Sequence, residues 1–290
     1  MEQQDPSLPF EFRNKPVSQE AKKANWDTIE AAISREGSLP VRRKFRPATV
    51  AVLATVCLVV LGGIWWALSK NDKEAITTIA TNYGETKSIV LPDSSMVTLN
   101  AKSSIRIPQT WRATAPREVW LEGEAYFKVQ KKPATHQKFI VHTKDVNVEV
   151  LGTEFNVRDK DSNTQVLLTT GKVKLSVNDN QNEPVIMKPN QLTVYHPHNK
   201  KLLISEVNPE TYIAWIQHKL IFEKLPVQEI CKNIEHFFGT PITIEDAAIA
   251  RKELTGKLEL KNEETVMQTL SLLLGTPIKK TNNRFIIYSK

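Results

Sequence analysis

The stretch ATVAVLATVCLVVLGGIWWAL, residues 48–68, runs for 21 residues without one charge. At 1.5 Å of rise per residue, a helix of this length spans about 31 Å, close to the roughly 30 Å hydrocarbon core of a bilayer. A buried core helix seldom runs this long without a polar face. A cleaved signal peptide would have a shorter charged region before it and a small-residue cleavage site after it. The sequence therefore predicts a single transmembrane helix over residues 48–68.

Charged residues on either side of this stretch indicate its orientation. The flank before it carries a basic cluster, Arg42, Arg43, Lys44 and Arg46, whereas the charges of residues 70–74 after it sum to zero. Basic residues favour the cytoplasmic side of a membrane, and Trp65 and Trp66 suit the opposite interface. We therefore expect a cytoplasmic tail of residues 1–47, a short spacer of residues 69–78 and a large outer part.

The net charge of +7 is diffuse along the chain. No run of lysine and arginine is interleaved with aromatic residues, so direct nucleic-acid binding is not indicated. Cys57 falls in the membrane stretch and Cys231 in the outer part, so the two cysteines cannot pair within one chain. The outer part must therefore fold by burying a core, for which about 220 residues suffice.

One amphipathic pattern in the tail predicts a helix over about residues 18–36. Ser18 can cap this helix and Gly37 can end it. Trp26, Ile29 and Ile33 recur at helical spacing and form one apolar stripe on a charged helix. Because the tail holds no other element to cover this stripe, we interpret it as a contact surface for a partner protein. A linker helix lying on the membrane face is the alternative.

Residues 79–207 consist of short alternating runs that predict β-strands. Val146, Val148 and Val150 alternate with polar residues, as in a sheet with one buried side. Gly123, Gly152 and Gly171 each stand just before an apolar run. This pattern predicts an all-β body, built either from stacked turns, as in a solenoid, or as a sandwich.

An internal repeat follows in residues 212–290. A shift of 36 residues places Gly239-Thr240-Pro241-Ile242 over Gly275-Thr276-Pro277-Ile278 and aligns the apolar positions before them. Each copy reads as strand, helix and strand, with glycine just past the helix end. The sequence predicts a small α+β domain of two βαβ-like repeats whose helices lie on one face of a sheet.

Residue patterns that carry chemistry are weak. Glu122 and Glu124 would share one face of a strand without a partner acid, and His196 and His198 have no third ligand at zinc spacing. No motif of a nucleophile elbow, a metalloprotease, a phosphate-binding loop or a dinucleotide site is present. The sequence thus predicts no catalytic, metal or cofactor site. An envelope hydrolase remains an alternative only if carboxylates or histidines gather in space.

Four segments, in order, carry a family resemblance: YGE (83–85), LPDSSMVTLN (91–100), REVWLEGEAYF (117–127) and VLGTEFNV (150–157). Together they closely resemble the FecR family of membrane-anchored anti-sigma factors. The C-terminal repeat is similar to the domain that follows in Bacteroidetes-type members, which resembles the secretin and TonB short N-terminal fold. The motif residues to which the resemblance gives a structural role are Asp93, Asn100, Gly123, Glu124, Gly152, Phe155 and Asn156.

This resemblance implies a relay across three compartments. The chain would sit in the inner membrane with its C-terminal part in the periplasm. There it would meet the signalling domain of an outer-membrane TonB-dependent transporter. In the cytoplasm it would free or activate an extracytoplasmic-function sigma factor, commonly after cleavage by site proteases. The resemblance leaves open whether the tail inhibits the sigma factor or is required for its activity.

Two departures from the family pattern bear on this interpretation. Family members usually have glycine where Ser94 stands, and we expect the serine to shift the turn type and spare the fold. Many relatives also have a longer helical region before the tryptophan-containing helix, whereas only about 17 unpatterned residues precede it here. A membrane-tethered periplasmic binding or scaffold protein without sigma-factor control is therefore the rival hypothesis.

Overall fold

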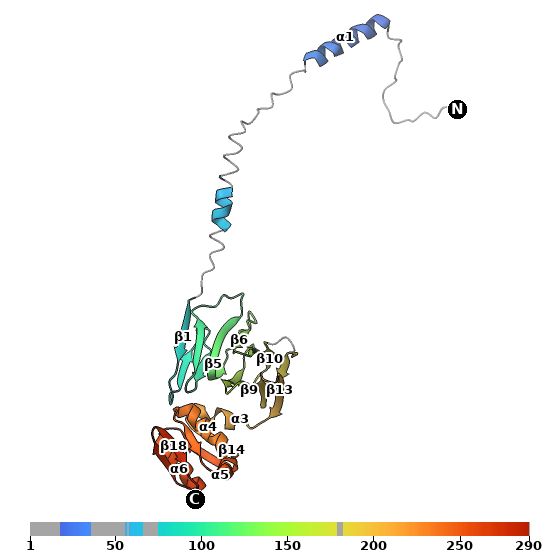
Figure 1. Ribbon diagram of the computed structural model, residues 1–290. Coiled ribbons are helices and arrows are strands. Elements are labelled where there is room, and N and C mark those ends of the chain that lie inside the picture. The colour runs from blue at the N-terminus through green and yellow to red at the C-terminus, as the bar shows by residue number, and fades with distance from the viewer. Residues whose placement is uncertain (1–17, 36–55, 57, 66–74, 179–181, 290) are drawn as a thin grey trace, which may run out of the picture. The chain divides into compact units, whose positions relative to one another are not determined.

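A computed structural model describes residues 18–35, 56, 58–65, 75–178 and 182–289, which fall into two compact units that divide between Asp72 and Lys73. In the first unit, α1 (Gln19–Arg35) occupies the place that the tail pattern predicts, and residues 56 and 58–65 are helical and exposed (Figure 1). Among the described residues no helix is both long and apolar enough to cross a membrane. The basic cluster at residues 42–46, Trp66 and most of the predicted transmembrane stretch lie outside the described residues.

Strands dominate the first part of the second unit, as predicted. Thirteen of them form one continuous sheet in this part of the chain: β1 (Ile76–Ala80), β2 (Lys87–Val90), β3 (Met96–Leu99), β4 (Ser104–Pro108), β5 (Arg117–Lys128), β6 (Phe139–His142), β7 (Val146–Val150), β8 (Glu154–Lys160), β9 (Asn163–Thr170), β10 (Val173–Val177), β11 (Val185–Met187), β12 (Gln191–His196) and β13 (Lys201–Glu206). The first strand begins inside the spacer predicted over residues 69–78, because Ile76 already pairs with Pro108 of β4.

The long strand β5 divides this sheet into two layers. Its first half pairs with β4 and β6, and its second half pairs with β3 and β8. Gly123, at the change of partners, has φ 94°, and a Cβ there would come within 2.8 Å of the Ser103 Cα. Glycine is needed because this backbone conformation and this close approach both exclude a side chain.

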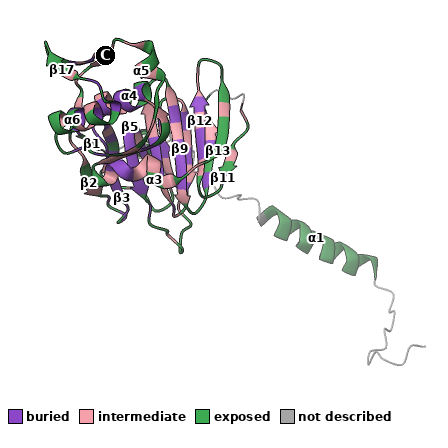
Figure 2. Cartoon of the chain, turned by 90° about the horizontal axis from the view of Figure 1, so that it is seen from below, coloured by how far each residue is buried: buried purple, intermediate pink, exposed green. Residues whose placement is uncertain are grey.

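The two layers enclose one core, which decides between the two predicted β architectures. The Phe127 ring stacks on the Phe155 ring in its own layer at 5.0 Å and lies 6.2 Å from the Phe139 ring of the other layer. Residues from both layers are buried together (Figure 2). The all-β body is therefore confirmed, and its layers face one another as in a sandwich.

A buried ion pair between Arg117 and Asp93 holds two connecting segments of the β body together. Arg117, 1 % exposed, contacts the Asp93 carboxylate and donates to the backbone oxygens of Gln130 and Gln137 at 3.0 and 2.8 Å. Asp93 also accepts from the Ser95 backbone N–H at 2.9 Å. The loop before β3 and the crossover after β5 are thus held to one guanidinium.

The turn before β3 differs from expectation at Ser94. This serine has φ 68°, a left-handed conformation that favours glycine, and its N–H donates to the Leu91 oxygen at 2.9 Å. The expected change to a turn type that suits serine is therefore not seen. The serine occupies a conformation that is strained for a residue with a Cβ.

We expect Ser94→Gly to raise the free energy of unfolding by about 0.5–1 kcal/mol, because glycine adopts this φ without strain. Urea unfolding of the two proteins measures the difference. The matched control is Ser88→Gly in the extended strand β2, where added backbone freedom should lower stability by about 0.5–1 kcal/mol. Equal effects of the two substitutions would contradict the conformational argument.

The C-terminal part contains both predicted repeats. The first is β14 (Lys219–Pro226), α4 (Val227–Phe238) and β15 (Ile242–Ile244), and the second is β16 (Glu253–Glu259), α6 (Glu263–Leu274) and β17 (Ile278–Thr281). Gly239 and Gly275 end the two helices with φ 81° and 67°. The aligned glycines therefore end the helix in both copies, as the sequence predicts.

The predicted single sheet is wrong, because the repeats exchange strands. β14 pairs with β16, whereas β15, β18 (Arg284–Ile287) and β17 form a separate three-stranded sheet. The short helix α5 (Ala247–Arg251) was not predicted. On α6, Met267 and Leu274 are buried, whereas Leu273 is 44 % exposed.

A helical connection, α3 (Pro209–Ile213) followed by the 3-10 helix η1 (Ala214–Gln217), joins the β body to the C-terminal domain. Asn208 caps α3 by accepting from the Glu210 N–H at 3.2 Å. Trp215 in η1 is buried. The connection is thus packed rather than extended.

Candidate functional site

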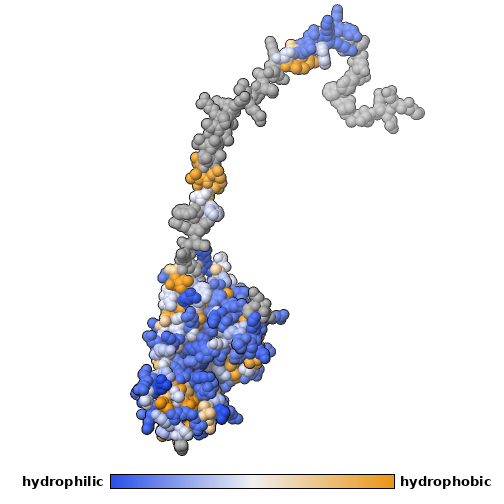
Figure 3. Space-filling model, in the orientation of Figure 1, coloured by the Kyte–Doolittle hydropathy of each residue, from blue (hydrophilic) through white to orange (hydrophobic). Residues whose placement is uncertain are grey.

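The stripe proposed for partner binding lies on an exposed helix. The Ser18 hydroxyl accepts from the Ala21 N–H at 3.3 Å, as the predicted cap requires. Trp26, Ile29 and Ile33 are 66 %, 47 % and 67 % exposed. Figure 3 shows hydrophobic residues on one side of an otherwise hydrophilic α1. A helix with one uncovered apolar side offers the arrangement needed to dock into a groove of another protein.

Three of the family-motif residues meet in the second unit. Glu124, 4 % exposed on β5, accepts from the Asn100 Nδ2 and from the Asn156 Nδ2, both at 2.9 Å. The Asn100 Oδ1 in turn accepts from the Ala101 N–H at 2.8 Å. A buried carboxylate is stabilised when hydrogen bonds replace its hydration. The three residues therefore tie the end of β3, the centre of β5 and β8 together.

The remaining motif residues lie elsewhere in the β body. Asp93 belongs to the Arg117 pair, and Phe155 to the core. Gly152 packs so closely that a Cβ would come within 2.7 Å of the Lys131 Cβ. Phe155 and Gly152 thus contribute to packing and Asp93 anchors a loop, whereas Asn100, Glu124 and Asn156 form a polar contact.

Beside this polar cluster, the β body contacts the C-terminal domain. The Arg158 guanidinium donates to the Asn233 Oδ1 at 2.9 Å and to the His236 Nδ1 at 3.0 Å, both on α4. The His236 Nε2 lies 2.8 Å from the Asp161 carboxylate. The Gly84 N–H donates to the Phe237 oxygen at 2.6 Å. The two domains thus meet through charged side chains of the β body, polar side chains of α4 and a backbone hydrogen bond.

His236 has a definite protonation state in this contact. A guanidinium can only donate, so the Nδ1 must accept and the Nε2–H donates to Asp161. Burial and the Arg158 charge lower the pKa of His236, although the Asp161 carboxylate acts in the opposite direction. The neutral imidazole is therefore the form that fits the interface.

Lys160, the next residue on β8, is also constrained. Its Nζ donates to the Ala101 oxygen at 3.1 Å. Burial lowers the pKa of Lys160, and the nearby Glu124 carboxylate opposes this shift. Burial likewise raises the pKa of Asp159 at the same end of the strand. Both residues are partly buried at the domain contact.

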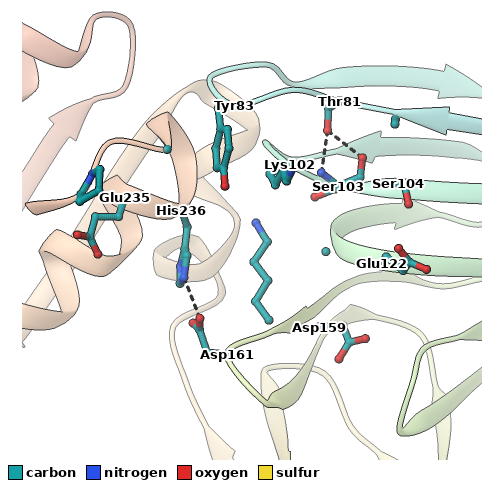
Figure 4. A pocket seen from close by; sticks show the side chains of 15 residues that line it. Thr81, Tyr83, Lys102, Ser103, Ser104, Glu122, Asp159, Asp161, Glu235 and His236 are labelled. Carbon is teal, nitrogen blue, oxygen red and sulfur yellow. Dashed lines mark hydrogen bonds and ion pairs between the residues drawn. The ribbon is translucent and has the colours of Figure 1, made fainter. Parts of the chain in front are cut away.

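A cavity of about 700 Å³ opens along this contact. Figure 4 shows Tyr83, Lys102 and Ser103 on the β-body side, and Glu235 and His236 on the α4 side. The aromatic ring of Tyr83 lies against Gly239, where a Cβ would come within 2.6 Å of the Tyr83 Cγ. The glycine that ends α4 thus also permits the domain contact.

The carboxylates and histidines considered for catalysis or metal binding do not form a site in the described structure. Glu122 is exposed at the cavity, whereas Glu124 is buried in the polar cluster, so the two carboxylates do not form a pair. His196 ends β12, and His198 lies exposed in the following turn. Among the described residues no three or more His, Cys, Asp or Glu side chains group as metal ligands would. Burial raises the pKa of the Cys231 thiol to about 12.

Sequence reasoning missed the residues of the domain contact and Arg117. Arg117 begins a segment that carries the family resemblance, and Arg158 directly follows another such segment. His236 and Asp161 have no local signal, because their partners are distant in sequence. The position of Arg117 at the start of a family segment was the available clue.

The geometry defines a class of protein: a two-layer β body fused to a small α+β domain, with a separate exposed amphipathic helix. Comparison with known proteins assigns this class to a family. The family described as "FecR protein" matches residues 77–174, and "FecR, C-terminal" matches residues 219–287. The chain belongs to the FecR family.

Solved structures agree with this assignment. Two crystal structures of a candidate anti-sigma factor from Parabacteroides distasonis, at 2.50 and 1.65 Å resolution, are each 28 % identical to this chain with a TM-score of 0.63. Each match covers 74 % of this chain and 100 % or 99 % of the other. The curated proteins give no match.

Proposed function

We propose that this chain is a membrane-anchored anti-sigma factor whose tail binds an extracytoplasmic-function sigma factor. Family membership carries this proposal, together with the likeness to the Parabacteroides distasonis protein. The exposed stripe of Trp26, Ile29 and Ile33 on α1 supports it from the chain's own residues. The proposed partner acts in transcription, and the chain itself binds no nucleic acid and catalyses no reaction.

The proposed location is the inner membrane, with residues 48–68 as the single span. The basic cluster before this stretch supports a cytoplasmic tail and a periplasmic second unit. In this arrangement the tail and the β body lie in different compartments. A signal reaching the second unit must then pass through the span, or through its cleavage by site proteases, to reach the sigma factor.

The proposed input is the signalling domain of a TonB-dependent outer-membrane transporter. The C-terminal domain supports this role through its small sheets, β14–β16 and β15–β18–β17, whose outer strands have edges that can pair with another strand. It is also held to the β body through Arg158 and α4, so a partner bound there acts on the whole second unit.

Cysteine labelling in intact cells tests the orientation. A membrane-impermeant maleimide that has crossed the outer membrane should label Ser205→Cys on exposed β13 and should not label Ser34→Cys on α1 until the inner membrane is opened. Labelling of Ser34→Cys before that step would contradict a cytoplasmic tail. The wild-type chain serves as the control for its own cysteines.

Deletion of residues 1–37 separates this function from that of a tethered binding protein. An anti-sigma factor should lose control of its sigma factor, so transcription from the dependent promoters should change several-fold and stop responding to the signal. A tethered envelope protein would function unchanged without the tail. RNA sequencing of the deletion strain measures the difference.

A further inference from the structure

The strand β13 is a free sheet edge. It pairs with β12 in an unbroken antiparallel register, from Gln191 opposite Glu206 to His196 opposite Lys201. In the described part of the chain β12 is its sole strand neighbour. A strand with one neighbour leaves a row of backbone N–H and C=O groups that another strand can bond.

This edge has few of the features that protect sheet margins. Its sequence, KLLISE, contains no proline, and its register with β12 shows no bulge. Leu203 and Ile204 at its centre are 55 % and 46 % exposed, and Figure 2 shows β13 as a largely exposed strand at the margin of the sheet. Natural edge strands usually carry central charges, prolines or bulges.

The other margins of the two layers are shorter. β1 has five residues, β2 four and β11 three, whereas β13 has six. A longer edge offers more backbone hydrogen bonds to a partner strand. β13 is therefore the margin best suited to sheet extension.

We infer that β13 is a self-association edge, at which a second copy of this chain adds antiparallel and extends the sheet across a twofold axis. The charges at the two ends of the strand select this partner. Lys201 begins the strand and Glu206 ends it, so antiparallel addition places each lysine near the partner's glutamate, twice. Parallel addition would bring like charges together.

A twofold axis near the middle of the strand also brings the apolar centres together. Leu203 of one copy then lies opposite Ile204 of the other, and both side chains become less exposed to water. Cross-strand apolar pairs of this kind stabilise strand pairing in addition to the backbone hydrogen bonds. The same edge thus supplies backbone pairing, apolar contact and charge complementarity.

Charge reversal tests this inference on the full chain purified in detergent micelles, with mass measured by light scattering across a dilution series. We expect the wild-type chain to dimerise and Lys201→Glu to weaken the dimer about tenfold, because two attractive pairs become repulsive. The double variant Lys201→Glu/Glu206→Lys should restore the wild-type affinity. A monomeric wild-type chain, an unchanged Lys201→Glu dimer or a double variant without rescue would each overturn the proposal.

Disulfide crosslinking tests the same contact by position. Under mild oxidation, Leu203→Cys/Ile204→Cys should give crosslinked dimers on a non-reducing gel, because the antiparallel pairing places position 203 of one copy opposite position 204 of the other. Leu272→Cys, on the 83 % exposed position of α6, is the matched control and should give no more dimer than the wild-type chain. Equal crosslinking of the two variants would show that collision, not β13 pairing, brings the chains together, and would overturn the proposal.

Discussion

Replacing Arg117 by alanine is expected to lower the free energy of unfolding of the second unit by about 3–5 kcal/mol. The substitution leaves the buried Asp93 carboxylate without its countercharge and leaves the backbone oxygens of Gln130 and Gln137 without their donor. A buried charge that loses its partner pays the cost of desolvation without compensation. This effect would be a large fraction of the stability of a typical domain.

Urea unfolding measures the loss, and an exposed ion pair provides the control. Lys138 and Glu149 lie 2.9 Å apart with side chains 51 % and 27 % exposed, so Lys138→Ala should cost less than about 1 kcal/mol. The double variant Arg117→Ala/Asp93→Ala should be less destabilised than the sum of its single variants, because no unpaired charge remains. An Arg117→Ala protein within about 1 kcal/mol of wild type would contradict the assigned role.

The double variant Trp26→Ala/Ile33→Ala is expected to abolish sigma-factor binding by the tail. Large apolar side chains at the centre of an interface contribute about 2 kcal/mol or more each, so losing both should weaken binding by about 1,000-fold. Both positions are exposed on α1, and alanine favours the helix, so the substitutions remove contact surface without unfolding it. Circular dichroism of the peptide checks that the helix is retained.

The matched control for this pair lies on the opposite side of the helix. Asp27→Asn/Thr28→Ala changes two residues away from the stripe and should leave binding within a few-fold of wild type. Binding is measured by titration of the labelled tail with the sigma factor. Normal binding by Trp26→Ala/Ile33→Ala would exclude the stripe as the contact surface.

The neutral state of His236 predicts a pH dependence of the domain contact. Because the folded pKa of His236 is lowered, the unfolded chain binds more protons as the pH falls through about 6.5, and stability is lost towards acid pH. We expect His236→Asn, which keeps an acceptor for Arg158, to reduce the loss of stability between pH 7 and 5. His198→Asn, in an exposed turn, is the control; the same pH dependence in both variants would contradict the prediction.

Local patterns in the sequence predicted the elements that depend on near neighbours. The cap at Ser18 and the spacing of Trp26, Ile29 and Ile33 gave α1 correctly. The repeat placed two helices that each end at an aligned glycine, Gly239 and Gly275. These features depend on periodicity and on backbone conformations that particular residues favour, and both are visible within a few residues.

Contacts between distant segments could not be predicted in this way. The polar cluster joins Asn100, Glu124 and Asn156 from three strands, and Arg158 meets His236 across 78 residues of sequence. The exchange of strands between the C-terminal repeats has the same origin, because alternation identifies a strand but not its neighbour. The family motif pointed to the cluster residues without indicating that they meet.

The most direct test of the anti-sigma proposal uses residues 1–47 as bait in a lysate of the source organism at low salt, with the bound proteins identified by mass spectrometry. The account predicts that a sigma factor is recovered with the wild-type tail and lost with Trp26→Ala/Ile33→Ala. Recovery of no sigma factor with the wild-type tail would contradict the account and would favour a tethered envelope-binding protein.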